Sequence, residues 1–384
     1  MINVAVMFGG RSVEHDVSII SAIQAMENFD KSKYNVYPVY ITKDNEFYYG
    51  ESLKSLKEFY NKESLLQKSS RVVFAKNNGK VRMMYFPFSE ANEAICEVDV
   101  VFPIVHGTNV EDGILQGYLK TLDVPFVGCD VLSSAIGMDK YVMKVLLRSE
   151  GFPVLDGIRF SVFDYENVME VVEAVERKFD YPVIVKPVNL GSSVGVSKAN
   201  NRSELVDSVE LSTKFATKIL IEPAIVNLKE VNCSVLGNEK ECIVSECEEP
   251  VTTHEFLDFE EKYISGAKKC GSKGMASLKR KIPAEIDAET KQNIQKIAQR
   301  AFKYLECCGV IRLDFMIDMD SNTVWLNEIN TIPGSLAFYL WEAIGMSYPD
   351  LIDRLIDLAV TRYEKEKTVN YTYESSIIEN LTAK

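Results

Sequence analysis

The chain has 384 residues, of which 46% are hydrophobic and 26% charged, and its formal net charge is −13 at pH 7. This length is sufficient for two or three domains with a large buried core, and the composition excludes a wholly disordered chain. The acidic charge argues against nucleic acid as the main partner, because a phosphate backbone requires a basic face.

Residue usage argues against a membrane protein and against a zinc protein. No apolar run approaches the roughly 18 residues that predict a transmembrane helix, and the start lacks the basic and cleavable segments of a signal peptide, so we expect no membrane partner. Eight cysteines without CxxC spacing and only three histidines argue against a zinc site. Free cysteines are typical of a reducing compartment, which predicts a cytoplasmic protein.

The first third of the chain alternates predicted strands and helices. Apolar residues 2–8 predict a buried strand that ends in the turn Gly9-Gly10. Further elements are expected as a helix at 16–28, strands at 36–41, 98–105 and 124–128, and a helix at 131–149. Such alternation is typical of a parallel sheet with helices between its strands.

Two more units are expected in the rest of the chain. The second has a strand at 181–186, a Gly/Ser turn at 189–196 and a strand at 218–222. The third has strands at 230–237 and 241–246, a helix at 286–306, paired strands at 310–317 and 323–330, and a helix at 349–362. We interpret the last residues, 364–384, as a tail.

The strongest chemical signal lies in the expected hairpin of 310–317 and 323–330. Strand alternation places Arg312 and Asp314 on one face, and Glu328 and Asn330 on a face of the neighbouring strand. Two carboxylates and an amide oxygen form the all-oxygen site that Mg²⁺ prefers, with phosphate oxygens completing its coordination. A solvated hairpin with acids outside is the alternative, but Asp and Asn are poor mid-strand residues. The pattern therefore favours a metal site.

A second candidate site begins at Lys186, at the end of an apolar strand, and continues through the turn at 189–196. Glycines let backbone N–H groups approach a phosphate, and serines add hydroxyl donors. The lysine precedes the glycines, so the order differs from the GxxxxGK[ST] phosphate loop. Taken alone, a tight surface turn explains this pattern equally well.

Three other segments are ambiguous individually. A glycine turn before a helix, as at 8–18, is a general anion site in α/β sheets, but acids there are also favoured by the helix dipole alone. The absence of GxGxxG argues against a dinucleotide and hence an oxidoreductase. Segment 106–113 is explained as well by a capping turn, and 255–263 by an exposed amphipathic stretch.

Taken together and in this order, the segments resemble the D-alanine–D-alanine ligase family of ATP-grasp enzymes. Seven motifs that span nearly the whole chain to about residue 362 carry the resemblance. They are FGGRSVEHDVS at 8–18, HGTNVEDG at 106–113, GMDK at 137–140, VKPVNLGSSVG at 185–195, HEFLDFEEKY at 254–263, RLDF at 312–315 and NEINTIPG at 327–334.

The resemblance implies an α/β protein with the ATP-grasp fold and a Rossmann-like N-terminal domain. The implied division is an N-terminal domain at 1–127, a central ATP-grasp subdomain at 128–223, a C-terminal subdomain with the metal site at 224–363, and the tail at 364–384. The family also implies a homodimer with contacts through the N-terminal domain.

The resemblance further implies a set of ATP-binding residues. Asp314, Glu328 and Asn330 would bind two Mg²⁺ ions, with Mn²⁺ as an alternative. The residues implied for the nucleotide are Lys140, Lys186, Ser193 and Lys262 for the phosphates, and Glu222 and Glu230 for adenine and ribose.

A second set of residues is implied for the amino-acid substrates. Glu14 would bind the ammonium of the first D-amino acid, with Ser192 and Tyr263 linking Glu14 to a closing loop. His106 would lie near the substrates. Arg312 and the Gly334 N–H would form an oxyanion hole.

The implied reaction joins two D-alanines through an acylphosphate, for a peptidoglycan precursor. The chain departs from the family where the loop after Gly334 is several residues shorter, which leaves Ser335 as the only hydroxyl close by. A different acceptor (D-serine, D-lactate or another amine) therefore remains open, as does a non-catalytic ATP-binding protein.

Overall fold

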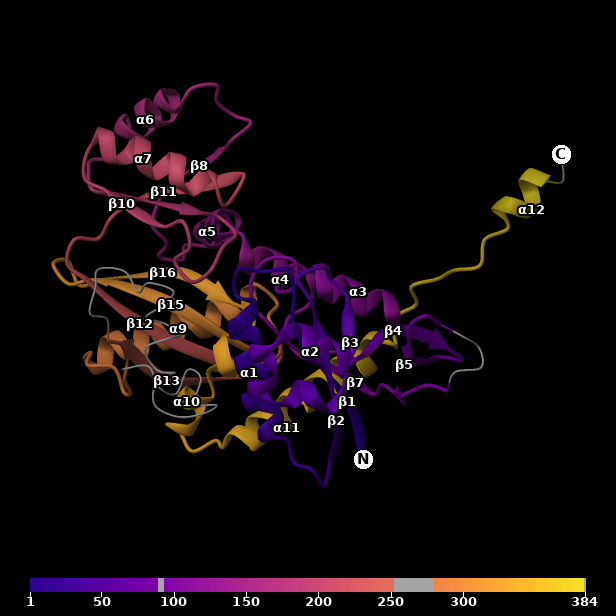
Figure 1. The fold of residues 1–384 in the computed structure, drawn as a ribbon. Coiled ribbons are helices and arrows are strands. Elements are labelled where there is room, and N and C mark those ends of the chain that lie inside the picture. Colours follow the sequence, from indigo (N-terminus) through magenta and orange to yellow (C-terminus); the bar gives the residue numbers. More distant parts are fainter. Residues whose placement is uncertain (89–92, 252–279, 383–384) are drawn as a thin grey trace.

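The computed structural model describes residues 1–88, 93–251 and 280–382. Among these residues the strands form three sheets, which Figure 1 shows side by side, with the central sheet and its helices α6 and α7 at the top. The C-terminal sheet lies below it, and the N-terminal sheet lies beside that.

The N-terminal sheet has the strand order β6-β5-β4-β3-β2-β1-β7. Its strands are β1 (Ile2–Gly9), β2 (Tyr34–Ile41), β3 (Phe47–Tyr49), β4 (Ser70–Asn77), β5 (Lys80–Tyr85), β6 (Cys96–Glu97) and β7 (Val100–Val105). Only β1, β2 and β7 pair in parallel, so the prediction of a parallel sheet is wrong for the other half. There the connections from β2 to β3, β4 to β5 and β5 to β6 are too short for a parallel crossover, and β3 and β4 are also antiparallel.

The helices of this unit include α1 (His15–Glu27), close to its predicted range, and α3 (Ile114–Leu122). Shorter helices occupy the connection from β3 to β4, namely η1 (Glu51–Lys54), η2 (Leu56–Tyr60) and α2 (Lys62–Gln67). The core of this unit also takes in the buried face of α11 (Tyr348–Glu366), which packs against β7 and β15.

Two predictions near residue 128 are wrong. Segment 124–128 forms an isolated parallel bridge between Phe126 and Val101 rather than a strand, since Pro125 has no N–H to extend the pairing. The helix expected at 131–149 is two helices, α4 (Val131–Met138) and α5 (Lys140–Ser149). Asp139 separates them, and its side chain accepts N–H bonds from the first turn of α5.

The central sheet is antiparallel, with the order β10-β9-β11-β8. Its elements are β8 (Ile158–Ser161), α6 (Val168–Glu176), β9 (Val183–Pro187), β10 (Ser197–Ala199), α7 (Arg202–Thr213) and β11 (Lys218–Pro223). Valines of α6 and leucine and valine of α7 pack on β9 and β11 in one small core. Lys186 and Glu222 are carried on these two adjacent strands.

The C-terminal sheet has the order β14-β13-β12-β15-β16. Its elements are β12 (Leu228–Gly237), β13 (Cys242–Pro250), β14 (Arg280–Lys281), α9 (Ala288–Tyr304), β15 (Gly309–Asp318) and β16 (Thr323–Asn330). Helix α9 covers one face, so alternate residues of β15, such as Leu313 and Phe315, are buried and leave Asp314 on the other face.

The chain then passes through the short helices η5 (Gly334–Ala337) and α10 (Phe338–Glu342) before α11. Helix α11 extends to Glu366, beyond the predicted end at residue 362. The segment that follows runs away from the body and ends in α12 (Ile377–Thr382), as Figure 1 shows. Among the described residues, no helix is both long and apolar enough to cross a bilayer.

Candidate functional site

The hairpin of β15 and β16 brings the four predicted polar side chains together. Across the strands, Arg312 pairs with Asn330, and Asp314 pairs with Glu328. The Arg312 guanidinium donates to both carboxylate oxygens of Asp314, at 2.6 and 2.8 Å. The Asn330 amide nitrogen donates to Asp314 at 3.1 Å. The predicted hairpin is therefore confirmed.

Lys140 connects this hairpin to the Gly/Ser turn. Its ammonium lies 3.2 Å from a Glu328 carboxylate oxygen and donates to the Leu190 carbonyl at 2.7 Å. Its backbone N–H bonds the Val188 carbonyl. Because α5 begins at Lys140, the start of this helix determines where the ammonium lies.

The hairpin oxygens suit a hard divalent cation. Within the described ranges no three His, Cys, Asp or Glu side chains converge, so the site has two carboxylates at most. An ion here would have Asp314, Glu328 and the Asn330 amide as its protein ligands. Burial raises the pKa of Asp314, and the Glu328 carboxylate raises it further, against the effect of Arg312. A cation between the carboxylates would offset their repulsion. Mg²⁺ fits this small donor set because it keeps waters and phosphate oxygens as ligands.

A buried charged cluster lies beside the hairpin. Lys186 Nζ lies 2.5 Å from one carboxylate oxygen of Glu222, and Lys144 Nζ bonds the other. The Asn327 amide oxygen accepts from Lys186 at 3.2 Å and from Lys144 at 3.4 Å. Although burial alone would raise it, the pKa of Glu222 is lowered because both lysines favour the carboxylate. Glu222 is therefore ionised inside the protein.

Lys144 was missed by the sequence reasoning. One signal was available, because Lys144 follows Lys140 by four residues, and residues at that spacing share one side of a helix. On an amphipathic helix, however, a lysine is usually solvated. Only its burial, at 2% exposed, distinguishes Lys144 from a surface lysine.

Glu14 is enclosed by three segments that are distant in sequence. The Ser192 hydroxyl donates to Glu14 Oε1 at 2.5 Å. A Cβ on Gly107 would come within 2.9 Å of Glu14 Oε2, and one on Gly191 within 2.7 Å. A side chain at either position would displace this carboxylate, so glycine lets the loops at 8–18, 106–113 and 189–196 meet around it.

His106 bonds protein groups through both ring nitrogens. Nδ1 donates to the Ile332 carbonyl at 2.9 Å, and Nε2 accepts from the Ser21 hydroxyl at 3.1 Å. The Ser21 oxygen also accepts the Ser335 N–H at 3.0 Å. Burial lowers the pKa of His106 to about 4, so the ring is neutral, and the carbonyl partner assigns its proton to Nδ1.

Glu111 holds the same segment through its carboxylate. Oε1 accepts the Ile332 N–H at 2.8 Å, and Oε2 accepts the Gly107 N–H at 2.9 Å. Burial first, and then the charge of Glu14, raise the pKa of Glu111 to about 7. The 106–113 motif therefore holds residues 331 and 332, and Ser21 holds Ser335, so Gly334 lies between two fixed positions.

The backbone after Gly334 is buried in an unfavourable conformation. Ser335, Leu336 and Ala337 have φ values of 49°, 55° and 51°, in the left-handed region that favours glycine. All three side chains are enclosed, and Ser335 is 0% exposed. Such strain persists where surrounding contacts fix the backbone.

The remaining predicted residues are less informative. Lys262 and Tyr263 lie outside the described residues. Ser193 follows Ser192 in the Gly/Ser turn, with φ values of 60° and 54°. Glu230 is exposed on β12.

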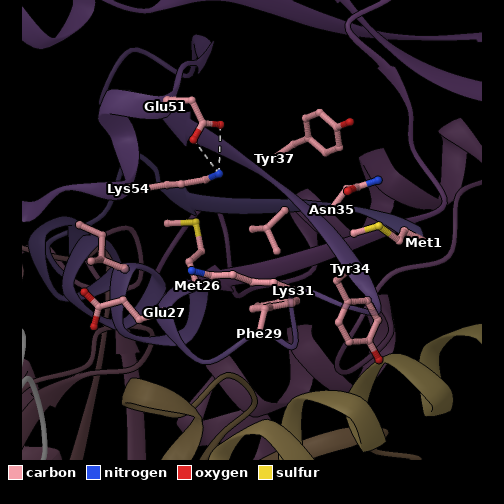
Figure 2. Close-up of a pocket in the computed structure, with 12 residues that line it drawn as sticks. Met1, Met26, Glu27, Phe29, Lys31, Tyr34, Asn35, Tyr37, Glu51 and Lys54 are labelled. Atoms are coloured by element: carbon pink, nitrogen blue, oxygen red, sulfur yellow. Dashed lines mark hydrogen bonds and ion pairs between the residues drawn. The ribbon is translucent and has the colours of Figure 1, made fainter.

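A separate pocket of about 620 Å³ lies at the opposite end of β1 (Figure 2). It is lined by Met1, Tyr34 and Asn35 at the starts of β1 and β2, and by residues such as Met26 from the second half of α1. The predicted site residues of this unit follow the carboxyl end of β1 instead. The pocket is therefore distinct from the candidate site.

Titration of His106 predicts a specific pH dependence of stability. Its pKa is about 4 when folded and about 6.5 when unfolded, so the neutral ring contributes fully above pH 6.5 and this contribution is lost as the pH falls toward 4. The loss amounts to about 3 kcal/mol. Urea unfolding of the wild type and of His106→Gln should therefore give free energies that converge between pH 7 and pH 4. Profiles that stay parallel would show that His106 is not buried as a neutral ring.

Comparison with known proteins shows the family to which the chain belongs. Residues 3–129 match the family model described as D-ala D-ala ligase N-terminus, and residues 146–357 match D-ala D-ala ligase C-terminus. A D-alanine–D-alanine ligase from Acetivibrio thermocellus is 40% identical over 377 residues, which cover 94% of this chain and 96% of that protein.

Solved structures give the same result. The D-alanine-D-alanine ligase from Coxiella burnetii superimposes with a TM-score of 0.78 at 29% identity, covering 96% of each chain. The VanG D-Ala:D-Ser ligase from Enterococcus faecalis has a TM-score of 0.76 at 33% identity, covering 93% of this chain and 99% of that one. The predicted ATP-grasp fold is thereby confirmed. The chain belongs to the D-alanine–D-alanine ligase family, whose members are ADP-forming carboxylate–amine ligases.

Proposed function

We propose that this protein joins two D-alanines to D-alanyl-D-alanine, with ATP converted to ADP and phosphate, for the synthesis of a peptidoglycan precursor. One observation carries the proposal. Lys140 contacts Glu328 of the hairpin and bonds the Gly/Ser turn, and Ser192 of that turn bonds Glu14, so the groups for ATP and for an amino acid adjoin.

In the first step, the carboxylate of one D-alanine attacks the γ-phosphate of ATP, and ADP leaves. Two anions must approach each other, so the reaction needs positive charge around the phosphates. Lys140 and Lys186 supply this charge, with Ser193 and Lys262 as further proposed phosphate ligands. Mg²⁺ held by Asp314, Glu328 and Asn330 would neutralise charge on the phosphate oxygens.

Glu14 orients the first amino acid in this proposal. Its carboxylate would bind the substrate ammonium, and the Ser192 hydroxyl holds the carboxylate in place. Tyr263 is proposed to extend this link. His106 has both ring nitrogens bonded to the protein, so we propose that it acts by positioning the segment that contains Gly334.

In the second step, the amine of the second amino acid attacks the acylphosphate carbon, and phosphate leaves. Negative charge develops on the carbonyl oxygen as the tetrahedral intermediate forms. We propose that Arg312 and the Gly334 N–H donate to this oxygen, an effect of about 3–4 kcal/mol per donor. Glu222 and Glu230 are proposed to help bind the nucleoside.

A second candidate function differs in the acceptor substrate. Ser335 is fully enclosed, and its N–H is bonded to Ser21. Its hydroxyl is buried without a hydrogen-bond partner among the described residues, so it is not exposed to a substrate. An acceptor other than D-alanine, such as D-serine, D-lactate or another amine, is therefore the second candidate.

We also propose the localisation, the oligomeric state and the domain division of the protein. The described cysteines carry no disulfide, which fits a reducing cytoplasm. We further propose a homodimer that forms through the N-terminal unit, at 1–127, with 128–223 and 224–363 as the two ATP-grasp subdomains and 364–384 as the tail.

Removing the hairpin carboxylate should abolish most of the activity. Asp314→Asn is expected to lower kcat/KM for phosphate release by about 100-fold or more, because a proposed Mg²⁺ ligand loses its charge. Asp318→Asn is the matched control, since Asp318 lies on the same strand but at its far end, bonded to Ser321. Equal effects of the two substitutions would contradict the proposed metal site.

A substrate panel should distinguish the acceptors. Purified protein is incubated with ATP, Mg²⁺ and D-alanine, alone or with D-serine or D-lactate, and products are identified by mass. D-alanine alone is expected to give phosphate and the dipeptide, whereas a mixed product in large excess would establish the second candidate. ATP binding without phosphate release from any substrate would overturn the ligase proposal.

A further inference from the structure

The charged cluster of Lys144, Lys186, Glu222 and Asn327 joins two of the three sheets. Lys186 lies on β9 and Glu222 on the adjacent strand β11, both in the central sheet. Asn327 lies on β16 of the C-terminal sheet, and Lys144 lies on α5. Contacts within this cluster therefore cross the junction at which the proposed ATP site is built.

Lys144 is enclosed and directed wholly at protein partners. Its side chain is 3% exposed and that of Glu222 is 2% exposed, whereas that of Lys186 is 8% exposed. Its ammonium bonds one carboxylate oxygen of Glu222 and the Asn327 amide oxygen. An ammonium this enclosed and bonded to these two partners is not placed to contact a nucleotide.

Lys186 depends on the same two partners. It uses two of its three N–H donors on Glu222 and Asn327. Its third donor has no protein partner in the part of the chain that the structure describes, and is therefore available to a phosphate oxygen. The direction of this donor is determined by where the two acceptors lie.

We propose that Lys144 is a positioning residue for nucleotide binding, which holds Glu222 and Asn327 where they aim Lys186 at the nucleotide phosphates. The inference rests on the proposed function, because it assumes that Lys186 contacts ATP. Without Lys144, one Glu222 oxygen would be buried without a partner, and the carboxylate would draw the Lys186 ammonium toward itself. The first consequence is a loss of affinity for ATP.

The test is a double-mutant cycle on the full-length protein. A non-hydrolysable ATP analogue with Mg²⁺ is titrated calorimetrically into the wild type, Lys144→Met, Glu222→Gln and the double variant. Lys144→Met should weaken binding by about tenfold or more, whereas adding it to Glu222→Gln should change the affinity by less than about twofold. The KM for D-alanine should change little, because Glu14 is not part of the cluster.

Two further variants make the test decisive. Lys291→Met is the matched control, since Lys291 is also a helix lysine paired to a carboxylate, Glu246, at 2.6 Å. It should leave the affinity unchanged. Lys144→Gln replaces Lys144→Met if that variant does not fold, because an amide can still donate to Glu222, and it should give a smaller loss.

The outcomes separate this inference from the proposed reaction. Unchanged affinity in Lys144→Met, or the same loss with and without Glu222→Gln, would overturn the positioning role. A wild type that binds the analogue but releases no phosphate would contradict the ligase reaction alone, and the affinities would still decide the role of Lys144. A wild type that binds no nucleotide would overturn both.

Discussion

Enclosed charge at the junction of the central and C-terminal sheets is the constraint on which the rest of the structure depends. A buried ion without a partner costs several kcal/mol, so each charged side chain here must meet an opposite charge or a polar group. Those partners come from other elements: Glu222 of β11 meets Lys144 of α5, and Glu328 of β16 meets Lys140. The same pairs that make burial tolerable therefore hold the two sheets together and place the lysines next to the hairpin.

The N-terminal unit is connected to this junction by a different kind of contact. Close approach of Glu14 depends on glycine at positions 107 and 191, where a side chain would meet its carboxylate. His106 and Glu111 then bond the backbone on both sides of Ile332. These contacts place the proposed amino-acid site and the proposed oxyanion site on one rigid frame. They also hold a strained segment after Gly334, where the acceptor would lie.

Sequence pattern was sufficient to predict those features that depend on residues close together in the chain. Strand alternation was sufficient to place Asp314 and Glu328 on one side of the hairpin, although the register shifts after Asp314, because α9 covers the opposite face. The ordered motifs were sufficient to predict the family and its fold. The helix break at Asp139 was missed, since an N-cap has meaning only once the helix boundary is known.

Features that depend on distant residues could not be predicted in the same way. Lys144 is 78 residues from Glu222, and nothing in its own helix distinguishes it from a solvated lysine. The contacts of His106 with Ile332 span 226 residues, so the 106–113 motif remained open between a capping turn and a site. Strand direction in the N-terminal sheet likewise could not be predicted, because β3 and β4 pair antiparallel across a long connection that contains helices.

The central claim is that a substrate carboxylate attacks the γ-phosphate of ATP. The most direct measurement uses D-alanine labelled with ¹⁸O in its carboxyl group and follows the oxygen isotope in the released phosphate by mass spectrometry. Formation of an acylphosphate predicts one ¹⁸O atom transferred to phosphate for each product molecule formed. Product formation with unlabelled phosphate would contradict carboxylate activation by phosphoryl transfer.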